Sequence, residues 1–521
     1  MSVPESRILR GIPYVTGAAS ATLLSADLEL SFWGGVDPKT GEIIDRFHPL
    51  SGCWLKDTIL AIPGGRGSCG GSVIVMELIL NGLGPKALIF QRSEEIITLG
   101  VMIFVKLWTG TGRPFTSWGG GGGQVSDAPL NDSLANKAVE PAIDINTLKT
   151  RLSDTDQAML DGANGEAARI SLKIIVRMAH MMGAPELMDV SQAHADAAWY
   201  GPGSVAFGQR LRASGDRFLV PTTINSLNID QKRWRALGVN AEFGSACDEL
   251  AKAFVDMGGK ISFTCAPYLL ETAPKLGDPI AWGESNAVIY ANSVLGARTL
   301  NNPNMLEALI ALTGRAPKAG VYVDENRLAS VWLRVTPPRG IDDSFWPILG
   351  YALGAIAMTR IPVITGLENL KPSNDNFKAF SAAFATSSSA PMFHMVNPTP
   401  EAPTFETVCP HGVIPEAFDV DWKHLEAIWD EFNHGSKPRE IDLISFGNPH
   451  FSFQEIKEVS KLCQGRTKKG DVAVVVTCGR AQYGLASQAG YTEELEKFGI
   501  QFLQDTCWCS IEEPIFTTGL D

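Results

Sequence analysis

The chain has 521 residues, of which 45% are hydrophobic and 19% are charged, and its formal net charge is −13. A chain of this length is expected to form two or three domains with a large core. The negative charge argues against a nucleic-acid partner or an anionic membrane, and no apolar run reaches the roughly 18 residues of a membrane span. The start, Met1–Ser6, lacks the basic and apolar regions of a signal peptide, so we expect a cytoplasmic protein.

Nine cysteines are scattered along the chain, and no two of them form a Cys-x-x-Cys pair. They are Cys53, Cys69, Cys247, Cys265, Cys409, Cys463, Cys478, Cys507 and Cys509. This odd, scattered set does not predict a secreted disulfide framework, and the spacing excludes zinc ribbons and ferredoxin motifs. Most of these thiols are expected to be buried apolar groups, and any metal site must combine cysteines far apart in sequence.

The first 110 residues predict alternating short strands and loops, followed by a helix. Residues 58–62 form a short apolar strand, and the glycine-rich loop 64–71 follows it. Ser72 is expected to cap an apolar helix that runs to about residue 80, where Gly82 can end it. Residues 87–90 form the next strand, which completes one β–loop–α–β unit.

A run of five glycines, Gly119–Gly123, then interrupts the pattern and leads into a stretch rich in Ser, Asp and Asn. Such a segment is typical of a flexible linker. We therefore predict a small domain over residues 1–125, a linker over 126–150 and a large domain over 151–521.

The large domain opens with a helical periodicity from residue 168 to about residue 182. After it, helical stretches alternate with apolar runs at residues 217–220, 260–264, 441–446, 472–477 and 501–503. This alternation predicts an α/β domain with largely parallel sheets, whose active sites gather at the carboxyl ends of the strands. Cys265, the segment Gly447–His450 and Cys507 each follow such a run.

The glycine-rich loop offers backbone amides and a helix N-terminus, which together form an anion site. Ser68 lies at that end, where the same field can stabilise its alkoxide form, and Arg66 can clamp a carboxylate. The loop also satisfies the dinucleotide pattern G-x-G-x-x-G, with Glu94 near the position of a ribose-binding acid. A tight turn without a ligand is the third interpretation.

Further candidates lie in the large domain. Cys265, Cys507 and Cys509 can ligate a metal, although each can also be a buried thiol. The polar segment 281–299 is costly to bury unless its side chains pair with each other or with a ligand. His194, His394 and His450 are also candidates, but no G-x-S-x-G elbow supports a Ser-His-Asp triad.

Taken together, these segments resemble the aconitase X family over nearly the whole chain. The small-domain blocks are Gly35–Pro38 with Thr40-Gly41, His48-Pro49 and Gly65–Ser68. The large-domain blocks are Ala193-His194, Pro221–Asn225, Thr264-Cys265 with Pro267–Leu269, Trp282–Thr299, Phe393-His394, Thr399–Ala402, Pro449-His450 and Asp505–Cys507. So many blocks in one order are far more specific than the dinucleotide pattern.

The resemblance implies a small swivelling β/α domain fused to a large, multi-lobed α/β catalytic domain like that of aconitases. Family members dehydrate a hydroxy acid and use an iron–sulfur cluster, which can act as a Lewis acid. The resemblance makes Ser68 the base, with Gly67 and Cys69 beside it on the substrate loop. Because Gly70 stands where aconitases have an arginine, Arg66 would have to bind the substrate in its place.

The resemblance also puts Cys265 and Cys507 at two cluster positions, while Asn448 stands at the third. An amide oxygen is a hard ligand for iron, so a 2Fe–2S cluster is expected in preference to a 4Fe–4S one. Cys69, Cys409 and Cys509 are possible replacement ligands.

The fused domains and the altered cluster motif favour the hydroxyproline branch of the family. The substrate would be cis-3-hydroxy-L-proline, and the product an enamine that tautomerises to Δ1-pyrroline-2-carboxylate. Either a cluster iron would coordinate the departing hydroxyl as a Lewis acid, or His194 or His394 would protonate it. The residues expected to orient the substrate are Glu284, Ser285, Asn286 and Arg298.

Other functions remain open at this point. The same fold could act on mevalonate 5-phosphate or another hydroxy acid, and the glycine loop could serve an NAD(P)-dependent oxidoreductase. An RNA-binding relative is disfavoured by the net charge of −13. A monomer and a homo-oligomer are both compatible with the sequence.

Overall fold

The computed structural model describes residues 14, 18–109, 149–410, 415–433, 441–512 and 515. The glycine run Gly119–Gly123 and residues 126–148 of the predicted linker lie outside the described residues. None of the helices within the described ranges has the length and apolar character needed to cross a membrane.

The small domain contains the predicted β–loop–α–β unit. Its strands β1 (Thr22–Ser25), β2 (Thr58–Ile62) and β3 (Ala87–Phe90) form a parallel sheet in that order. Its helices are α1 (Gly71–Leu80), α2 (Glu95–Phe104) and the π-helical turn η1 (Val105–Thr109). The expected cap was wrong, because Ser72 lies inside α1 and its hydroxyl donates to the carbonyls of Cys69 and Asn304.

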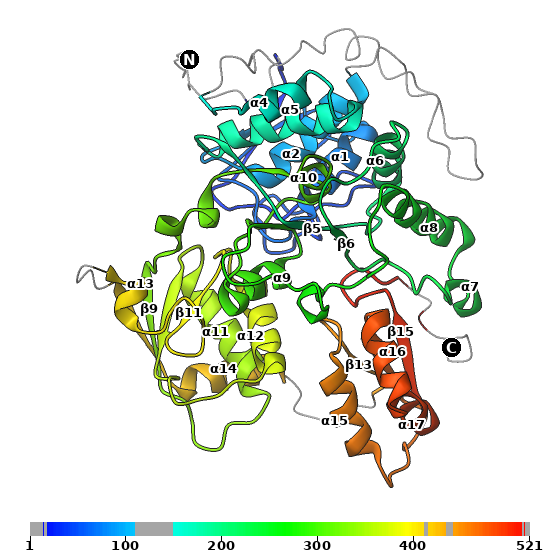
Figure 1. The fold of residues 1–521 in the computed structure, drawn as a ribbon, viewed down its shortest axis with the longest axis vertical. Coiled ribbons are helices and arrows are strands. Elements are labelled where there is room, and N and C mark those ends of the chain that lie inside the picture. Colours follow the sequence, from blue (N-terminus) through cyan, green and yellow to red (C-terminus); the bar gives the residue numbers. More distant parts are fainter. Residues whose placement is uncertain are drawn as a thin grey trace, which may run out of the picture.

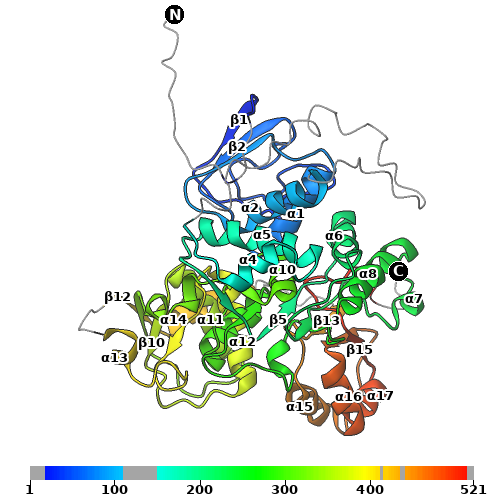
Figure 2. The same ribbon diagram turned by 45° about the horizontal axis from the view of Figure 1, so that its top comes forward.

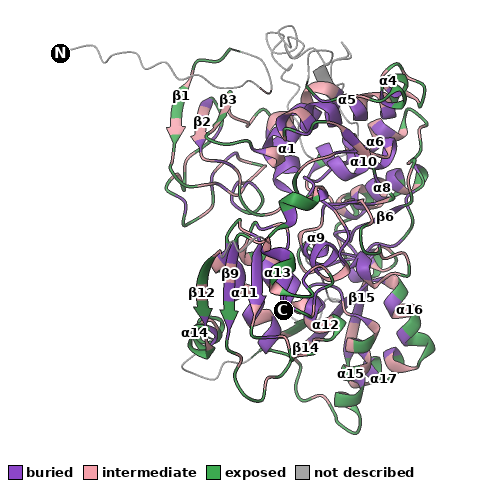
Figure 3. Ribbon diagram, turned by 60° about the vertical axis from the view of Figure 1, so that its left-hand side comes forward, coloured by how far each residue is buried: buried purple, intermediate pink, exposed green. Residues whose placement is uncertain are grey.

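The first part of the large domain surrounds a parallel sheet of order β6-β5-β7. The strands of this sheet are β5 (Gln192–Ala195), β6 (Thr222–Ile224) and β7 (Ile280–Trp282), while β4 (Leu187–Asp189) and β8 (Arg315–Pro317) form a separate antiparallel pair. Its α-helices are α4 (Asp154–Leu160), α5 (Glu166–Met181), α6 (Pro202–Arg212), α7 (Trp234–Leu237), α8 (Ala241–Asp256), α9 (Ser285–Tyr290) and α10 (Leu306–Thr313). Shorter helical turns are η3 (Pro267–Leu269), η4 (Ala291–Leu295), η5 (Gly320–Tyr322) and η6 (Asp324–Arg327). Every residue of α10 is buried, so it forms the centre of this part (Figure 3).

The second and third parts each build their own parallel sheet. The second part has the order β11-β10-β9-β12, and the third has the order β13-β14-β15. Elements of the second part are β9 (Val331–Val335), α11 (Phe345–Ala357), β10 (Pro362–Thr365), α12 (Asn374–Ser387), β11 (His394–Met395), α13 (Phe405–Val408), β12 (Glu416–Val420) and α14 (Trp422–Phe432). Elements of the third are β13 (Leu443–Phe446), α15 (Phe453–Cys463), β14 (Ala473–Cys478), α16 (Arg480–Gln488), α17 (Tyr491–Phe498) and β15 (Ile500–Gln504).

The arrangement places the first part at the centre of the molecule. The second and third parts lie side by side on one flank of it, and the small domain lies on the opposite flank (Figures 1 and 2). The α/β class with parallel sheets is therefore confirmed, and each part has its own apolar core.

Two predicted strands were wrong. Residues 217–220 form no strand, and residues 260–264 contribute only an isolated bridge between Lys260 and Thr223. The second run breaks because Phe263 adopts a φ of 35°, which no extended strand allows. The run still reaches the sheet, since the amide of Thr264 donates to the carbonyl of Ile224.

Candidate active site

Three polar residues follow the three strands of the central sheet directly or within two positions. Asp196 follows β5, Asn225 follows β6 and Glu284 lies two residues past β7. Because the strands are parallel, their carboxyl ends meet at one edge of the sheet, where ligands bind in α/β folds. Cys265 reaches the same edge through the bond from Thr264 to β6.

The third sheet brings a second set of residues to this edge. Asn448 lies two residues past β13, and Cys507 lies three residues past β15. A parallel bridge between Leu227 and Thr506 joins the two sheets, so their carboxyl ends face each other. Positions more than 240 residues apart in sequence, such as Cys265 and Cys507, thereby come into contact.

Three thiols and one amide gather there and are called the thiol cluster, defined as Cys265, Cys507, Cys509 and Asn448. The Sγ atoms of Cys265 and Cys507 are 3.6 Å apart. Asn448 Oδ1 lies 3.6 Å from Cys507 Sγ and 3.2 Å from Cys509 Sγ. Cys409 lies elsewhere, in a small apolar group with Val363 and Val408, so it is not part of the cluster.

His450 holds the backbone around the thiol cluster. Its Nδ1 lies 3.0 Å from Thr264 Oγ1 and its Nε2 lies 2.6 Å from the carbonyl of Thr506. These threonines immediately precede Cys265 and Cys507, and the amide of His450 donates to Cys265 Sγ at 3.4 Å. The ligand atoms of His450, Cys265 and Cys507 lie close enough together to share a metal ion. Both ring nitrogens of His450 already have partners, however, so this histidine positions the two cysteines and is poorly placed to bind a metal itself.

A group of buried carboxyl groups lies beside the thiol cluster. Burial raises the pKa of Glu284 and of Asp196, and the charge of Asp196 adds to the shift of Glu284. Burial, with the charge of Asp196, raises the pKa of Glu307 to about 8. The side-chain amide of Asn225 donates to both Asp196 and Glu284, at 3.4 and 3.3 Å. One side of the site is therefore lined by the buried carboxyl groups of Asp196, Glu284 and Glu307, whose raised pKa values favour their protonated forms.

The glycine-rich loop 64–71 of the small domain, called the substrate loop, contacts the large domain beside these carboxyl groups. Cys69 Sγ donates to the carbonyl of Gly283 at 2.8 Å, and the amide of Asn304 donates to the carbonyl of Cys69 at 3.1 Å. Ser68 comes immediately before Cys69, is half-buried, and its Oγ accepts the amide of Gly70 at 3.2 Å. Burial raises the pKa of Cys69 well above its usual value, and Glu284 is the next cause. The substrate loop therefore contacts Gly283, the residue immediately before Glu284.

Other residues of the glycine-rich loop make contacts within the small domain. Arg66 is 41% exposed and pairs with Asp45 at 2.7 Å, so its guanidinium is held on the small domain. Gly67 has a φ of 85°, and a Cβ there would lie 2.9 Å from Ser31 Oγ, so the turn requires glycine. Glu94 caps α2 by accepting the amides of residues 96, 97 and 98, which leaves it unavailable to a ribose and argues against the dinucleotide interpretation.

His194 lies at the sheet edge, and His394 does not. The His194 ring is 1% exposed, its Nδ1 lies 2.8 Å from Thr223 Oγ1, and its Nε2 has no partner. Burial lowers its pKa to about 4, while the side chain of Asn225 lies close enough to oppose that shift. His394 belongs to β11 of the second part, and its Nε2 lies 2.6 Å from the carbonyl of Arg327.

The polar segment 281–299 is divided between two environments. Asn286 belongs to the site, since its amide donates to Glu284 at 2.8 Å and to the carbonyl of Cys265 at 3.2 Å. Ser285 is the first residue of α9. Arg298 pairs with Asp324 and Glu401, and no described contact joins it to the thiol cluster.

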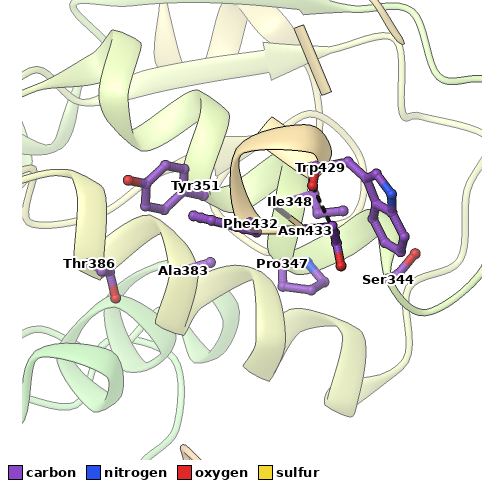
Figure 4. A pocket seen from close by; sticks show the side chains of 9 residues that line it. All are labelled: Ser344, Pro347, Ile348, Tyr351, Ala383, Thr386, Trp429, Phe432 and Asn433. Atoms are coloured by element: carbon purple, nitrogen blue, oxygen red, sulfur yellow. Dashed lines mark hydrogen bonds between the residues drawn. The ribbon is translucent and has the colours of Figure 1, made fainter. Parts of the chain in front are cut away.

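Two pockets on the described surface differ in their relation to the candidate residues. One, of about 310 Å³, opens between the small and large domains. Its lining includes Trp33, Glu77, Trp199, Tyr200 and Cys509, so it reaches the thiol cluster from the domain interface. The other, of about 510 Å³, is an apolar hollow between α11, α12 and α14 that contains none of the candidate residues (Figure 4).

Reasoning from the sequence singled out Glu284 but missed Asn225, which donates to it, and Asp196 with its partners Asn304 and Glu307. Asp196 and Asn225 come immediately after apolar strands, which is a signal that could have identified them. Asn304 and Glu307 carry no such signal, because they belong to the turn and helix that pack behind the sheet.

The chain is similar to known proteins over nearly its whole length. Models of the aconitase X swivel domain, first domain, second domain and third domain match residues 8–110, 149–325, 323–430 and 441–521. A cis-3-hydroxy-L-proline dehydratase of Hypocrea jecorina is 48% identical over 99% of this chain and 90% of its own length. A phosphomevalonate dehydratase large subunit of Methanocaldococcus jannaschii is 31% identical over 68% of this chain and 88% of its own. The crystal structure of Thermococcus kodakaraensis aconitase X in its holo-form matches with a TM-score of 0.62 and 29% identity, covering 69% of this chain and 89% of that one.

Proposed function

Since this chain belongs to the aconitase X family and is a dehydratase, we propose that it converts cis-3-hydroxy-L-proline into Δ1-pyrroline-2-carboxylate and water. The similarity to a relative of that name extends over 99% of this chain, which supports the substrate. The hydroxyl leaves C3 as Cα loses its proton, and the resulting enamine tautomerises to the cyclic imine. One water is released and no net proton is consumed.

The donor set of the thiol cluster fits an iron–sulfur cluster. Cys265, Cys507 and Cys509 offer soft sulfur donors, which iron–sulfur clusters prefer, and Asn448 adds one oxygen. We assign Cys265, Cys507 and Asn448 as ligands, with Cys509 as the replacement for a missing cysteine, and a 2Fe–2S cluster as the group they hold. When bound, the cluster would supply a Lewis acid for the departing hydroxyl.

Ser68 is the proposed base that removes the Cα proton. Its Oγ already accepts the amide of Gly70, and α1 begins at Gly71, so the helix N-terminus favours the alkoxide form. Gly67, Cys69 and the loop amides would hold the substrate carboxylate. Arg66 can join them only by leaving Asp45, so its part in binding is secondary.

His194 is the histidine placed to meet the 3-hydroxyl, because its Nε2 is the unpartnered nitrogen at the sheet edge. Since burial lowers its pKa to about 4, the ring would be neutral and act as a hydrogen-bond partner of the hydroxyl. Glu284 and Asn286 line the same edge, and Ser285 begins the helix that follows it. His394 and Arg298 contact Arg327, Asp324 and Glu401 and are assigned to the structure of the large domain.

One observation carries the proposal: the 2.8 Å contact between Cys69 Sγ and the carbonyl of Gly283 joins the substrate loop to the edge that bears the thiol cluster. The proposed base and the proposed cluster therefore belong to one site. The test is anaerobic purification with visible and electron paramagnetic resonance spectra, together with turnover of cis-3-hydroxy-L-proline followed by NMR. Absence of turnover in iron-replete protein would reject the substrate, and an active protein without iron would reject the cluster.

Mevalonate 5-phosphate is a weaker candidate on the geometry of the site. A phosphate needs unpaired Lys or Arg donors, but Lys378, which donates to the carbonyl of His450, is paired with Glu455, and Arg480 is paired with Asp505. Turnover assays with both substrates, run side by side, decide between them.

A further inference from the structure

The carboxyl groups of Asp196 and Glu284 face one another at the end of the central sheet. They follow β5 and β7, which are adjacent strands, and both accept the side-chain amide of Asn225. Two like charges held this close disfavour each other, and each would be stabilised by a positive group between or beside them.

Among the residues that the structure describes, no positive side chain pairs with either acid. The described donors to Asp196 are the amide of Ala198, the hydroxyl of Tyr200 and the side-chain amides of Asn225 and Asn304, all of them neutral. The described donors to Glu284 are the side-chain amides of Asn225 and Asn286. Neither acid takes part in any ion pair among the residues that the structure describes. Buried carboxylates are normally paired with a cation, so the arrangement lacks one.

A second observation is that two buried polar atoms near these acids have no hydrogen-bond partner among the described residues. The Nε2 of His194, on a ring that is 1% exposed, has no hydrogen-bond partner, and the side chain of Asn225 lies beside that ring. Glu307 also keeps its Oε2 unpartnered, while its Oε1 accepts the amide of Asp196 at 2.9 Å. Buried polar atoms are rarely left without a partner unless a ligand or a water meets them.

The position of Glu284 suits a ligand held between the two domains. After burial, its charge is the largest cause that raises the pKa of Cys69 on the substrate loop. Asn286, whose side-chain amide donates to Glu284 at 2.8 Å, also donates to the carbonyl of Cys265 at 3.2 Å, so Glu284 borders the thiol cluster. Glu284 therefore lies within electrostatic reach of both the Ser68 loop and the thiol cluster.

We propose that Asp196 and Glu284 form the receptor for the ammonium group of the substrate, with Glu284 in direct contact, so that this site selects amino acids over hydroxy acids without nitrogen. This inference rests on the proposed function and names the feature of the substrate that is recognised. In cis-3-hydroxy-L-proline the nitrogen is bonded to Cα, so a nitrogen held at Glu284 brings the Cα proton toward the Ser68 loop. An anionic phosphate in the same place would meet two carboxylates and be repelled.

Binding of inert ligands tests the receptor without turnover. Calorimetry on the anaerobically purified holoenzyme compares L-proline with cyclopentanecarboxylate, which keeps the ring and the carboxylate but lacks the nitrogen. Wild type should bind L-proline about 100-fold more tightly, because cyclopentanecarboxylate leaves the buried acids without their ammonium partner. Glu284→Gln and Asp196→Asn should each weaken L-proline binding by about 10- to 100-fold and change cyclopentanecarboxylate binding by less than about threefold.

Glu325→Gln is the matched control, because Glu325 is an exposed acid of the same domain. Retained iron and an unchanged unfolding midpoint confirm that each variant is folded, and two variants guard against one that fails to fold. Equal weakening of both ligands, or no weakening of either, would overturn the receptor.

Turnover separates this proposal from the proposed function. Wild type is assayed on cis-3-hydroxy-L-proline and on cis-2-hydroxycyclopentanecarboxylate. Normal turnover of the first with no preference for L-proline in binding would overturn the receptor and leave the dehydratase assignment standing. No turnover of the first with a clear preference for L-proline would overturn the substrate assignment and support the receptor.

Discussion

The carboxylate of Glu77, on α1 of the small domain, accepts the backbone amide of Ser204, on α6 of the large domain, at 3.2 Å. Glu77 is 1% exposed, and the backbone that surrounds its carboxylate contains Gly201 and Gly203. A Cβ on Gly203 would lie 2.6 Å from Glu77 Oε1. Because α1 begins directly after the substrate loop, this contact fixes Ser68 relative to the large domain.

Gly203→Ala is expected to separate the two domains partly. The new methyl group would collide with Glu77 Oε1 and with Leu80 Cδ1, at 2.6 and 2.5 Å, and overpacking of this kind costs about 1–3 kcal/mol. Hydrogen–deuterium exchange should rise in α1 and α6, and kcat should fall. Gly484→Ala is the control, since a Cβ there meets nothing within 4 Å. Unchanged exchange in α1 would show that the contact does not hold the domains together.

Glu77 should also make stability depend on pH. Burial raises its pKa from 4.5 to about 7, so the folded protein keeps this proton at pH values where the unfolded chain has released it. The free energy of unfolding should therefore fall as pH rises from 4.5 to 7, by about 3 kcal/mol, and then stay level. Glu77→Gln should remove this part of the slope in denaturant titrations at pH 5, 6, 7 and 8. The control is Glu426→Gln, an exposed residue, and identical slopes in wild type and Glu77→Gln would contradict the assignment.

Ser68→Ala should lower kcat by about 100- to 10,000-fold, the usual contribution of general acid–base catalysis. KM and the iron spectrum should change little, because the loop is held by Cys69 and Ser72 through their contacts with Gly283 and Asn304. Ser51→Ala, at an exposed position of the same domain, is the control. Turnover close to wild type in a folded Ser68→Ala protein would mean that another group is the base.

Features that depend on neighbouring residues could be predicted from the sequence, and contacts between distant residues could not. Strands β2 and β3 were predicted at their observed bounds, because each is a short apolar run next to a glycine turn. Cys265 and Cys507 were singled out because each follows an apolar run, but their separation of 3.6 Å depends on two sheets meeting through Leu227 and Thr506. Such contacts join positions far apart in sequence, and no local pattern encodes them.

Arg298 shows the opposite case. Its place in a polar segment suggested substrate binding, yet its guanidinium donates to Asp324 and Glu401, which lie 26 and 103 residues further along the chain. A single sequence does not tell which distant acids an arginine pairs with. It therefore cannot distinguish an arginine in a structural ion pair from one that binds a ligand, because both lie in a polar environment.

The ligand set of the thiol cluster is tested by serine variants. Cys265→Ser and Cys507→Ser should each lose most of the iron and the visible absorption, since a serine oxygen is a harder donor than a thiolate. Cys509→Ser should show a shifted spectrum, because this thiol is assigned as the replacement ligand, and a wild-type spectrum would remove it from the ligand set. Cys409→Ser is the control, because Cys409 is buried in a separate apolar group. Full iron content in Cys265→Ser would place the metal elsewhere.

His450 should affect the metal site through the two threonines that it contacts. His450→Phe leaves Thr506 without its donor and Thr264 without its ring partner, at a cost of about 1–3 kcal/mol for each buried group. We expect a lower unfolding midpoint and a reduced or broadened iron spectrum, while His450→Gln, which retains a donor and an acceptor, should restore part of both. His424→Phe is the control, because His424 is exposed on α14. A His450→Phe protein with a wild-type spectrum and unaltered stability would show that the cysteines hold their positions without this ring.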